Sequence, residues 1–577
     1  MSPLRGARLP ARLLQGLVVS GTVAAVAVGP AMAVASAEEP AGTTVVGRLV
    51  QAVAESEHHD DAHTAHTESL TWVETAAGAV PVASDDVAGV PSGSTVTLNV
   101  DGDVDGADGD GADGDATGTD GGEPLPVLDT EEVVPPTPAA VLPGPVTNEV
   151  TVVLVAPAGT APDAGVTPDQ IAELVRVPVA EFWSTQTDGA VRVGVGSAHD
   201  WIATAAGCAD PRGLWDEAAA AVGFRPGPGK HLLLRLSSQT AAQAGCSYAL
   251  AEVGTGPGSG GRLYVREQLA SVIAHELGHN FGLNHSSAVQ CDGAVETGSC
   301  RTAAYRDLYD VMGASWRELG SLNAPQAARL GVLPADRTVH LGVGGAATSV
   351  ALASVSAPTG VRAARLTAAD GTDYWLEYRT ATGQDAWLGG AANRYRLDSG
   401  VLLRRSASFP DSSVLLDGTP GAAAGWETDF QAALPVGVPI PLAGGDFTVT
   451  VSAQADGAVL EVVPRTSTTA EGAPAAAGSA APRDNGAGRL QASTGRPGPG
   501  PVSPADGAAT APAAVDPRTV PWFTTSEAAV VDSPMLEPLG RSTSSGGLVT
   551  AMTVAVAGAA LAGTTLLLVR RARLRVR

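Results

Sequence analysis

One eleven-residue stretch of this 577-residue sequence constrains the fold more than any other, the run HELGHNFGLNH from His275 to His285. It fills every fixed position of the pattern H-E-x-x-H-x-x-G-x-x-H. On a helix, His275 and His279 lie one turn apart on the same face, so both imidazoles can bind one metal ion. Gly282 can adopt the left-handed conformation that ends a helix, and the chain can then return His285 as a third ligand. Three imidazoles with an open fourth position predict a catalytic zinc site, because structural zinc sites are closed by a fourth side chain.

Glu276 and Met312 have the positions that such a site requires. The carboxylate of Glu276, next to the first histidine, can hold a water molecule without binding the metal. Met312 lies 27 residues after the third histidine and precedes a glycine, which is typical of a Met-turn, the loop beneath a three-histidine zinc site. The alternative is an exposed amphipathic helix with solvated histidines, which the completeness of the pattern disfavours. We therefore predict zinc ligands at His275, His279 and His285, the general base at Glu276, and a supporting role for Met312.

The sequence around this pattern resembles the metzincin metalloproteases, and among them the gametolysin-like (M11) peptidases and their bacterial relatives. The resemblance rests on the three-histidine pattern, on the run YRDLYDVMG from Tyr305 to Gly313, and on the run LNAPQAARLG from Leu322 to Gly331. It is strongest over residues 265–335 and looser over residues 147–465. It implies a twisted mixed sheet with an active-site helix, a sheet-edge strand that pairs with an extended substrate, and hydrolysis of peptide bonds in proteins.

Two positions differ from neighbouring metzincin families. Ser286 follows the third histidine, where the reprolysin group carries aspartate. Ala314 stands two residues after the methionine, where astacins and serralysins carry a tyrosine that faces the zinc. The sequence therefore has no obvious tyrosine ligand at that point. Tyr305 and Tyr309 are close enough to be considered, and packing is the favoured interpretation for both.

The two ends of the sequence predict export and membrane anchoring. Residues 1–37 combine three arginines, an apolar stretch and the small-residue cleavage site Ala35-Ser-Ala37, which is typical of a secretory signal peptide. A cut after Ala33 and an uncleaved anchor are the alternatives. Residues 548–569 carry no charge and are long enough to cross a bilayer core of about 30 Å, although a buried helix is the alternative. Five arginines follow in residues 570–577, so we expect a single-pass protein of the cell membrane with its catalytic domain outside the cell.

The sequence contains four cysteines, all in the expected catalytic domain. An even number of cysteines in an exported domain indicates two disulfide bonds. Sequence order favours Cys208–Cys246 and Cys291–Cys300 among the three possible pairings. The alternative, a metal site of four thiolates, lacks the C-x-x-C spacing that such sites use.

The net charge of −25 is concentrated in one segment. Residues 38–146 contain 22 acidic residues and one basic residue, so the acidity describes this segment and argues against nucleic-acid binding.

We predict an α+β protein: a metzincin-like catalytic domain, then an all-β domain of the sandwich type, and a C-terminal transmembrane helix. The expected segments are a signal peptide (1–37), an acidic low-complexity region or propeptide (38–146), a zinc protease domain (147–334), a β-sandwich-like domain (335–466), a Pro/Ala/Gly/Ser-rich stalk (467–547), the membrane helix (548–569) and a basic cytoplasmic tail (570–577).

The acidic region offers two further metal-binding patterns. Asp101 to Gly106 reads DGDVDG, like the opening of a calcium loop, but Ala112 stands at the twelfth position where glutamate is needed. A solvated linker is therefore favoured over a Ca²⁺ site. Four histidines between His58 and His66 could chelate a metal loosely, and a disordered polar tract is favoured. Val80–Val82 and Ser94–Val100 alternate like strands and predict a small β unit in this region. If the region is a propeptide, latency requires a ligand other than a thiolate, or steric bulk, because no cysteine precedes Cys208.

The sequence thus predicts a zinc endopeptidase that acts on extracellular or cell-surface proteins or peptides. Zinc would lower the pKa of a bound water, and Glu276 would accept its proton. One alternative is a surface adhesin with a vestigial metal site, although a site kept for structure does not need Glu276. The other alternative is a zinc amidase that hydrolyses cell-wall peptides.

Overall fold

The structure is a computed structural model that describes residues 42–55, 68–102, 123–314, 318–421 and 428–465, all within one compact unit of the chain. The predicted signal peptide, the four clustered histidines, most of the Asp/Gly run, and the predicted stalk and membrane helix lie outside these ranges. Within them, no helix is long and apolar enough to cross a membrane.

The first sheet has ten strands and joins the N-terminal region to the expected protease domain. Its parallel part contains β7 (Val193–Ala203), β6 (Asn148–Ala156), β8 (Lys230–Leu236) and β10 (Gly261–Val265). Strands β6 and β8 read as nearly continuous apolar runs because both of their faces are covered. The short strand β9 (Ala249–Glu252) pairs antiparallel with β10 and is the edge of this part of the sheet.

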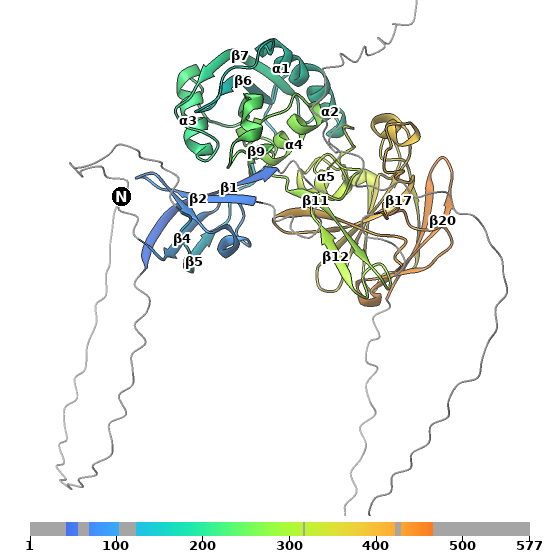
Figure 1. Cartoon of the computed structure of the whole chain (residues 1–577). Coiled ribbons are helices and arrows are strands. Elements are labelled where there is room, and N and C mark those ends of the chain that lie inside the picture. Colours follow the sequence, from blue (N-terminus) through green and yellow to red (C-terminus); the bar gives the residue numbers. More distant parts are fainter. Residues whose placement is uncertain (1–41, 56–67, 103–122, 315–317, 422–427, 466–577) are drawn as a thin grey trace, which may run out of the picture. The chain divides into compact units, whose positions relative to one another are not determined.

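The N-terminal β unit, which we define as strands β1 to β5, adds to that edge. Strand β1 (Thr43–Glu55) pairs antiparallel with β9, with Ala52 opposite Glu252 and Glu55 opposite Ala249. Figure 1 shows β1 ending beside β9 and α4. The other strands are β2 (Glu68–Glu74), β3 (Ala79–Val82), β4 (Thr95–Val100) and β5 (Val127–Val134). Valine and leucine side chains of these strands form a core of their own, so the described part of this acidic region is folded, and the predicted strands at 80–82 and 94–100 are confirmed.

The α-helices that precede His285 in the chain pack beside this sheet, and we call them and the sheet the first part of the protein. The segment after Thr167 forms α1 (Pro168–Leu174), a π turn at Val175–Val179 and α2 (Ala180–Gln186). The π turn contains Pro178, whose missing amide hydrogen disturbs regular α-helical bonding. Helix α3 (Pro211–Val222) packs on β8 through Leu214 and Trp215. Helix α4 (Ala270–Asn280) is buried along almost its whole length and contacts β9 and β10.

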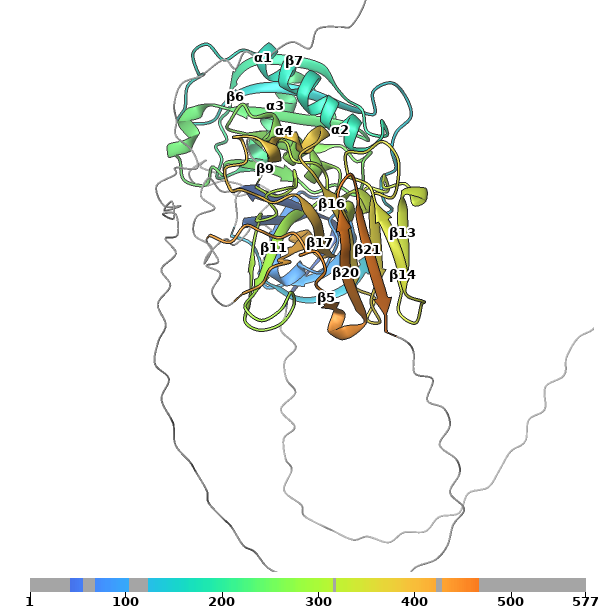
Figure 2. The same cartoon turned by 90° about the vertical axis from the view of Figure 1, so that its right-hand side faces the viewer.

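Residues 285–464 form the second part of the protein, which consists of two sheets with one core between them (Figure 2). The seven-stranded sheet runs β12-β11-β18-β17-β16-β15-β13 and the four-stranded sheet runs β14-β21-β20-β19. The short helix α5 (Ala324–Arg329) contacts β16, β17 and β18. The strand bounds are β11 (His285–Cys291), β12 (Cys300–Ala303), β13 (Thr338–Gly342), β14 (Thr348–Leu352), β15 (Ala363–Thr367), β16 (Asp373–Arg379), β17 (Gly400–Ser406), β18 (Asp411–Leu416), β19 (Ile440–Leu442), β20 (Phe447–Gln454) and β21 (Ala458–Pro464).

Two strands of this second part come from the segment expected to belong to the protease domain. Strand β11 pairs in parallel with β18, so the larger sheet extends across the expected boundary at 334/335. Sequence periodicity cannot reveal such a pairing, because its partners lie more than 120 residues apart. Both predicted disulfides are present: Cys208–Cys246, and Cys291–Cys300, which joins β11 to β12.

A buried group of charges links the Met-turn to the second part. The guanidinium of Arg404 on β17 donates to both carboxylate oxygens of Asp307, at 2.6 and 3.1 Å, and also to Glu377. Arg379 on β16 donates to Glu377 at 2.8 Å and to the carbonyl of Tyr309 at 3.0 Å. Every one of these charged side chains is fully buried. Burying a charge is unfavourable unless it is paired, so the set acts as one unit.

We predict that Arg404→Met destabilises the protein by about 3–5 kcal/mol, because it leaves Asp307 buried without its guanidinium partner. Arg405→Met is the matched control. Arg405 is its neighbour on the same strand, is 39% exposed and contacts Glu296 at 3.5 Å, so its loss should cost at most about 1 kcal/mol. Denaturant unfolding measures both values, and equal losses would contradict the role given to the buried group.

Candidate metal centre

Helix α4 and the turn after it bring the three histidines together as predicted. His275 and His279 lie one turn apart on α4, and both are fully buried. Gly282 has φ +90°, the left-handed conformation expected of it, and a Cβ there would lie 3.0 Å from the Gly254 carbonyl oxygen. The chain then starts β11 at His285, whose amide donates to the Pro410 carbonyl at 3.1 Å. The third histidine is thus fixed by a strand of the second part.

Main-chain carbonyls fix the orientation of two of the imidazoles. His275 Nδ1 donates to the carbonyl of Val311 at 2.7 Å, and His279 Nδ1 donates to the carbonyl of Leu283 at 2.9 Å. A carbonyl can only accept, so each Nδ1 carries a proton and each neutral ring has a lone pair at Nε2. Burial lowers the pKa of His279, and lowers that of His285 to about 3. Burial thus favours the neutral form that a metal needs.

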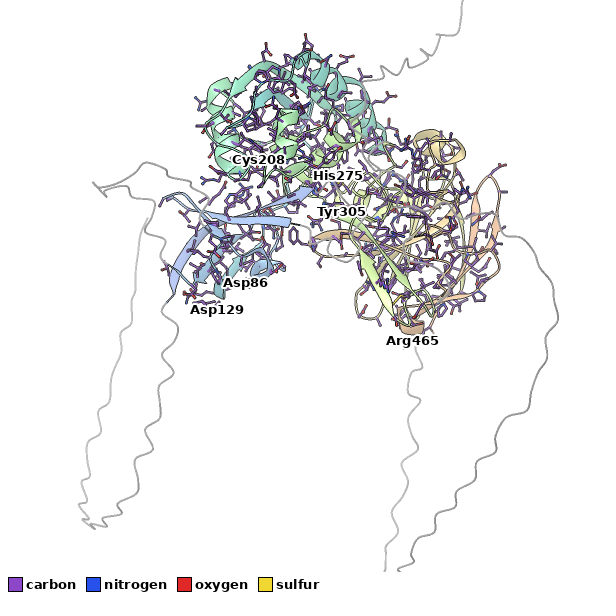
Figure 3. The ribbon with its side chains drawn as sticks, in the orientation of Figure 1. Asp86, Asp129, Cys208, His275, Tyr305 and Arg465 are labelled. Carbon is purple, nitrogen blue, oxygen red and sulfur yellow. A yellow bond between two sulfur atoms is a disulfide. The ribbon has the colours of Figure 1, made fainter. Side chains whose placement is uncertain are left out.

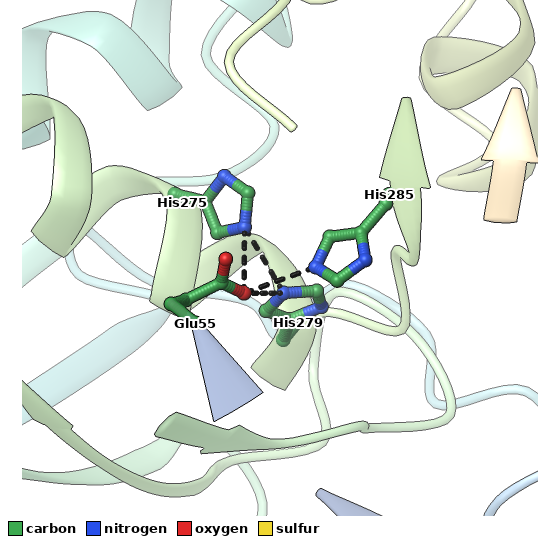
Figure 4. Close-up of side chains that lie close together, drawn as sticks. All are labelled: Glu55, His275, His279 and His285. Atoms are coloured by element: carbon green, nitrogen blue, oxygen red, sulfur yellow. Dashed lines mark hydrogen bonds and ion pairs between the residues drawn. The ribbon is translucent and has the colours of Figure 1, made fainter. Parts of the chain in front are cut away.

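Glu55, at the end of β1, completes a four-residue group that sequence reasoning missed (Figure 4). Its Oε1 lies 3.3 Å from Nε2 of His275, 3.4 Å from that of His279 and 3.0 Å from that of His285. The Nε2 atoms of His275 and His279 are 3.1 Å apart. Glu55 precedes His275 by 220 residues, so no local spacing could have identified it; its only signal is an acidic residue at the end of a strand whose last residues are buried.

This group fits a zinc ion. Four ligand atoms at about 2.0–2.1 Å from a tetrahedral zinc are separated by about 3.3 Å, which is close to the four distances given above. Lone pairs of two neutral imidazoles and a carboxylate oxygen repel one another unless a cation lies among them. The four potential ligand atoms all lie within 4.8 Å of one another, and Glu55 and the three histidines are buried.

Glu276 lies beside this group and is not one of its members. The side chain is fully buried, and its two carboxylate oxygens have no hydrogen-bond partner among the residues that the structure describes. Burial, and then the negative charge of Glu55, raise the pKa of Glu276 well above its ordinary value. A buried carboxylate with both oxygens unpaired is costly in a structural role and suits an acid–base group that binds water or substrate.

Met312 packs directly beneath the metal-binding helix. A Cβ on Gly278, which lies between the first two histidines, would come within 2.4 Å of the Met312 sulfur. The glycine therefore lets the methionine approach the helix axis. The amide of Met312 donates to Asp310 at 2.8 Å, and the same carboxylate accepts from Ser286 at 2.8 Å. Ser286, at the position where reprolysins carry aspartate, is thus joined to a carboxylate of the Met-turn.

The two tyrosines considered from the sequence have different surroundings. The ring of Tyr305 lies 3.9 Å from that of His285, and its hydroxyl donates to the carbonyl of Ala54 at 3.5 Å. Figure 3 shows Tyr305 near His275. Tyr309 instead donates to the carboxylate of Asp398 at 2.8 Å. Tyr305 therefore packs at the metal site, and Tyr309 packs away from it.

We predict that Gly278→Ala destabilises the protein by about 1–3 kcal/mol and weakens zinc binding, because the new methyl group displaces Met312. Alanine is otherwise favoured over glycine within a helix, so a destabilisation has to come from this contact. Gly227→Ala is the control, because its Cβ would meet only a Lys230 carbon at 4.0 Å. Unfolding and zinc titration measure both variants; a stabilised Gly278→Ala protein with unchanged zinc affinity would contradict the packing described.

Comparison with known proteins supports a metalloprotease. The family model described as metallo-peptidase family M12B, reprolysin-like, matches residues 237–309. The matched segment contains the helix with two of the histidines, the third histidine and the approach to the Met-turn. No curated protein matched the chain. A closer relation to the gametolysin-like peptidases stays a prediction from the sequence.

Proposed function

We propose that this chain is a zinc-dependent endopeptidase of the metzincin type, most similar to the gametolysin-like peptidases. The observation that carries the proposal is the convergence of three buried imidazole Nε2 atoms beside a buried carboxylate, Glu276, that has no other partner among the described residues. The M12B reprolysin-like match over the same segment supports it.

His275, His279 and His285 would hold the ion, each through Nε2. Zinc, when bound, would polarise the scissile carbonyl and lower the pKa of a water molecule towards about 7. The carbonyls of Val311 and Leu283 hold two of the imidazoles in the required tautomer. Met312 and Gly278 support the helix without contributing a ligand.

Glu276 would transfer the proton. Its carboxylate accepts a proton from the attacking water and later donates it to the nitrogen of the leaving amine. Burial, and then the charge of Glu55, raise its pKa, so this carboxylate takes up a proton more readily than an exposed glutamate does. The burial of its surroundings excludes bulk water from this transfer.

An extended polypeptide is the substrate class that the surroundings favour. Strand β9 lies next to α4, and it pairs with β10 on one side and with β1 of the N-terminal β unit on the other. A strand edge of this kind binds a peptide mainly through backbone hydrogen bonds. This favours an endopeptidase over the amidase alternative, and the unpaired Glu276 carboxylate favours an enzyme over an adhesin with a vestigial site.

We also propose that the protein is exported and anchored in the cell membrane by residues 548–569. The terminal segments of the sequence support this, through the small-residue cleavage site and the five arginines that follow the apolar span. The protein would then act on extracellular or cell-surface proteins.

The test of the activity is Glu276→Gln, made in a chain that also carries Glu55→Gln, which removes the Glu55 carboxylate from the metal centre. We predict one zinc per chain with and without the second substitution, and a fall in casein hydrolysis of at least about 1000-fold when Glu276 is replaced. Removing zinc with a chelator should abolish the hydrolysis and zinc should restore it. A chain that binds no zinc, or one that hydrolyses casein equally well without Glu276, would contradict the proposed function.

The test of location is a chain truncated before Leu548. The full chain should fractionate with membranes and be removed from intact cells by added protease, whereas the truncated chain should be found in the medium. Full-length protein recovered in the soluble cytoplasmic fraction would contradict both terminal assignments.

A further inference from the structure

We propose that the N-terminal β unit inhibits this enzyme: Glu55 is the fourth ligand of the zinc, and β1 occupies the sheet edge on which a substrate would bind. The inference rests on the proposed function. It assigns a residue and a strand that the sequence pattern did not connect with the site.

The first observation is that β1 already uses the edge of β9. Gln51 accepts at its carbonyl from the Val253 amide at 2.8 Å, and Glu55 accepts from the Tyr248 amide at 2.7 Å. The register between these bonds is unbroken, from Ala52 opposite Glu252 to Glu55 opposite Ala249. The other side of β9 pairs with β10. A strand has only two edges, so a peptide substrate cannot pair with β9 until β1 has left it.

The second observation is where β1 ends. Its antiparallel pairing with β9 brings Glu55 to the three histidines, and Oε1 lies 3.0–3.4 Å from all three Nε2 atoms. That position completes the tetrahedron of ligands, which is where the catalytic water of a zinc hydrolase binds. The carboxylate is completely buried, and an isolated buried carboxylate is costly, so it needs the cation that the histidines also need.

The third observation is that the strand is held firmly along its length. Val50, Ala52 and Ala54 of β1 pack into the same core as Leu250 and Tyr264 of the protease part. Ser92 of the same unit donates to the Val253 carbonyl at 2.8 Å and accepts from the Gln51 amide at 3.2 Å. Replacing Glu55 alone should therefore relieve the inhibition only in part, because β1 keeps its packing when the carboxylate is removed.

The Glu55 carboxylate can block the zinc in place of a cysteine thiolate. No cysteine precedes Cys208, and both cysteine pairs are joined in disulfides, so a thiolate cannot block the zinc from the N-terminal side. A carboxylate oxygen can bind zinc in its place. The competing explanation is a permanent structural zinc site with four protein ligands. It predicts that changing Glu55 removes the zinc, whereas the inhibitory role predicts that the zinc stays and becomes accessible to a hydroxamate.

The experiment compares the full chain with Glu55→Gln, and uses Glu74→Gln as the control. Glu74 lies in the same β unit, pairs with Arg48 at 3.2 Å and is 38% exposed, so it tests the loss of a carboxylate away from the site. Each protein is loaded with Co²⁺ in place of zinc, and a short peptide hydroxamate is titrated while the visible absorption of the cobalt is recorded. Metal stoichiometry and the unfolding midpoint are measured on the same samples.

We expect Glu55→Gln to keep one metal per chain and to bind the hydroxamate at least about tenfold more tightly than the native chain, because the competing ligand is weakened. Casein hydrolysis should rise only partly in the same variant, because β1 still occupies the edge of β9. The control should behave like the native chain in both measurements.

Equal hydroxamate affinity in the native chain and in Glu55→Gln would overturn the inhibitory role while leaving the zinc protease intact. Loss of the metal in a folded Glu55→Gln protein would overturn it in favour of a structural four-ligand site. A native chain that binds no metal would overturn the proposed function as well.

Discussion

The metal centre brings several lone pairs close together, and the surrounding structure holds them there against their mutual repulsion. Carbonyls accept from Nδ1 of two imidazoles and so direct their Nε2 atoms to the site, where these atoms lie 3.1 Å apart with a carboxylate oxygen close by. Such an arrangement fits a bound cation, whose charge would offset this repulsion. The turn at Gly282, the burial of α4 and the approach of Met312 all serve to hold these atoms in place.

The metal centre also connects the two parts of the protein. Its first two histidines belong to a helix beside the first sheet, and its third begins β11 of the second sheet. The Met-turn lies between them, with Asp307 bound by Arg404 and the carbonyl of Tyr309 bound by Arg379. The β domain is therefore a support for the site, since its strands fix one ligand and the loop beneath the others.

Local sequence was sufficient to predict the cluster of three histidines and both disulfides, because each depends on short spacing or on pairing in sequence order. The roles of Glu276 and Met312 stay predictions. Local sequence was insufficient where partners lie far apart. The pairing of β11 with β18 moves the third histidine into the second sheet, and Glu55 reaches the site only because β1 pairs with β9. In residues 38–146 the sequence predicted only two of the strands of the folded unit, because its valine and leucine core is spread over short strands.

X-ray absorption at the zinc edge of the purified full chain tests the central claim most directly. The account predicts one zinc with three imidazole nitrogens and one oxygen, at about 2.0–2.2 Å, and no sulfur ligand. A sample without zinc, or a spectrum with fewer than three imidazoles or with sulfur ligands, would contradict it.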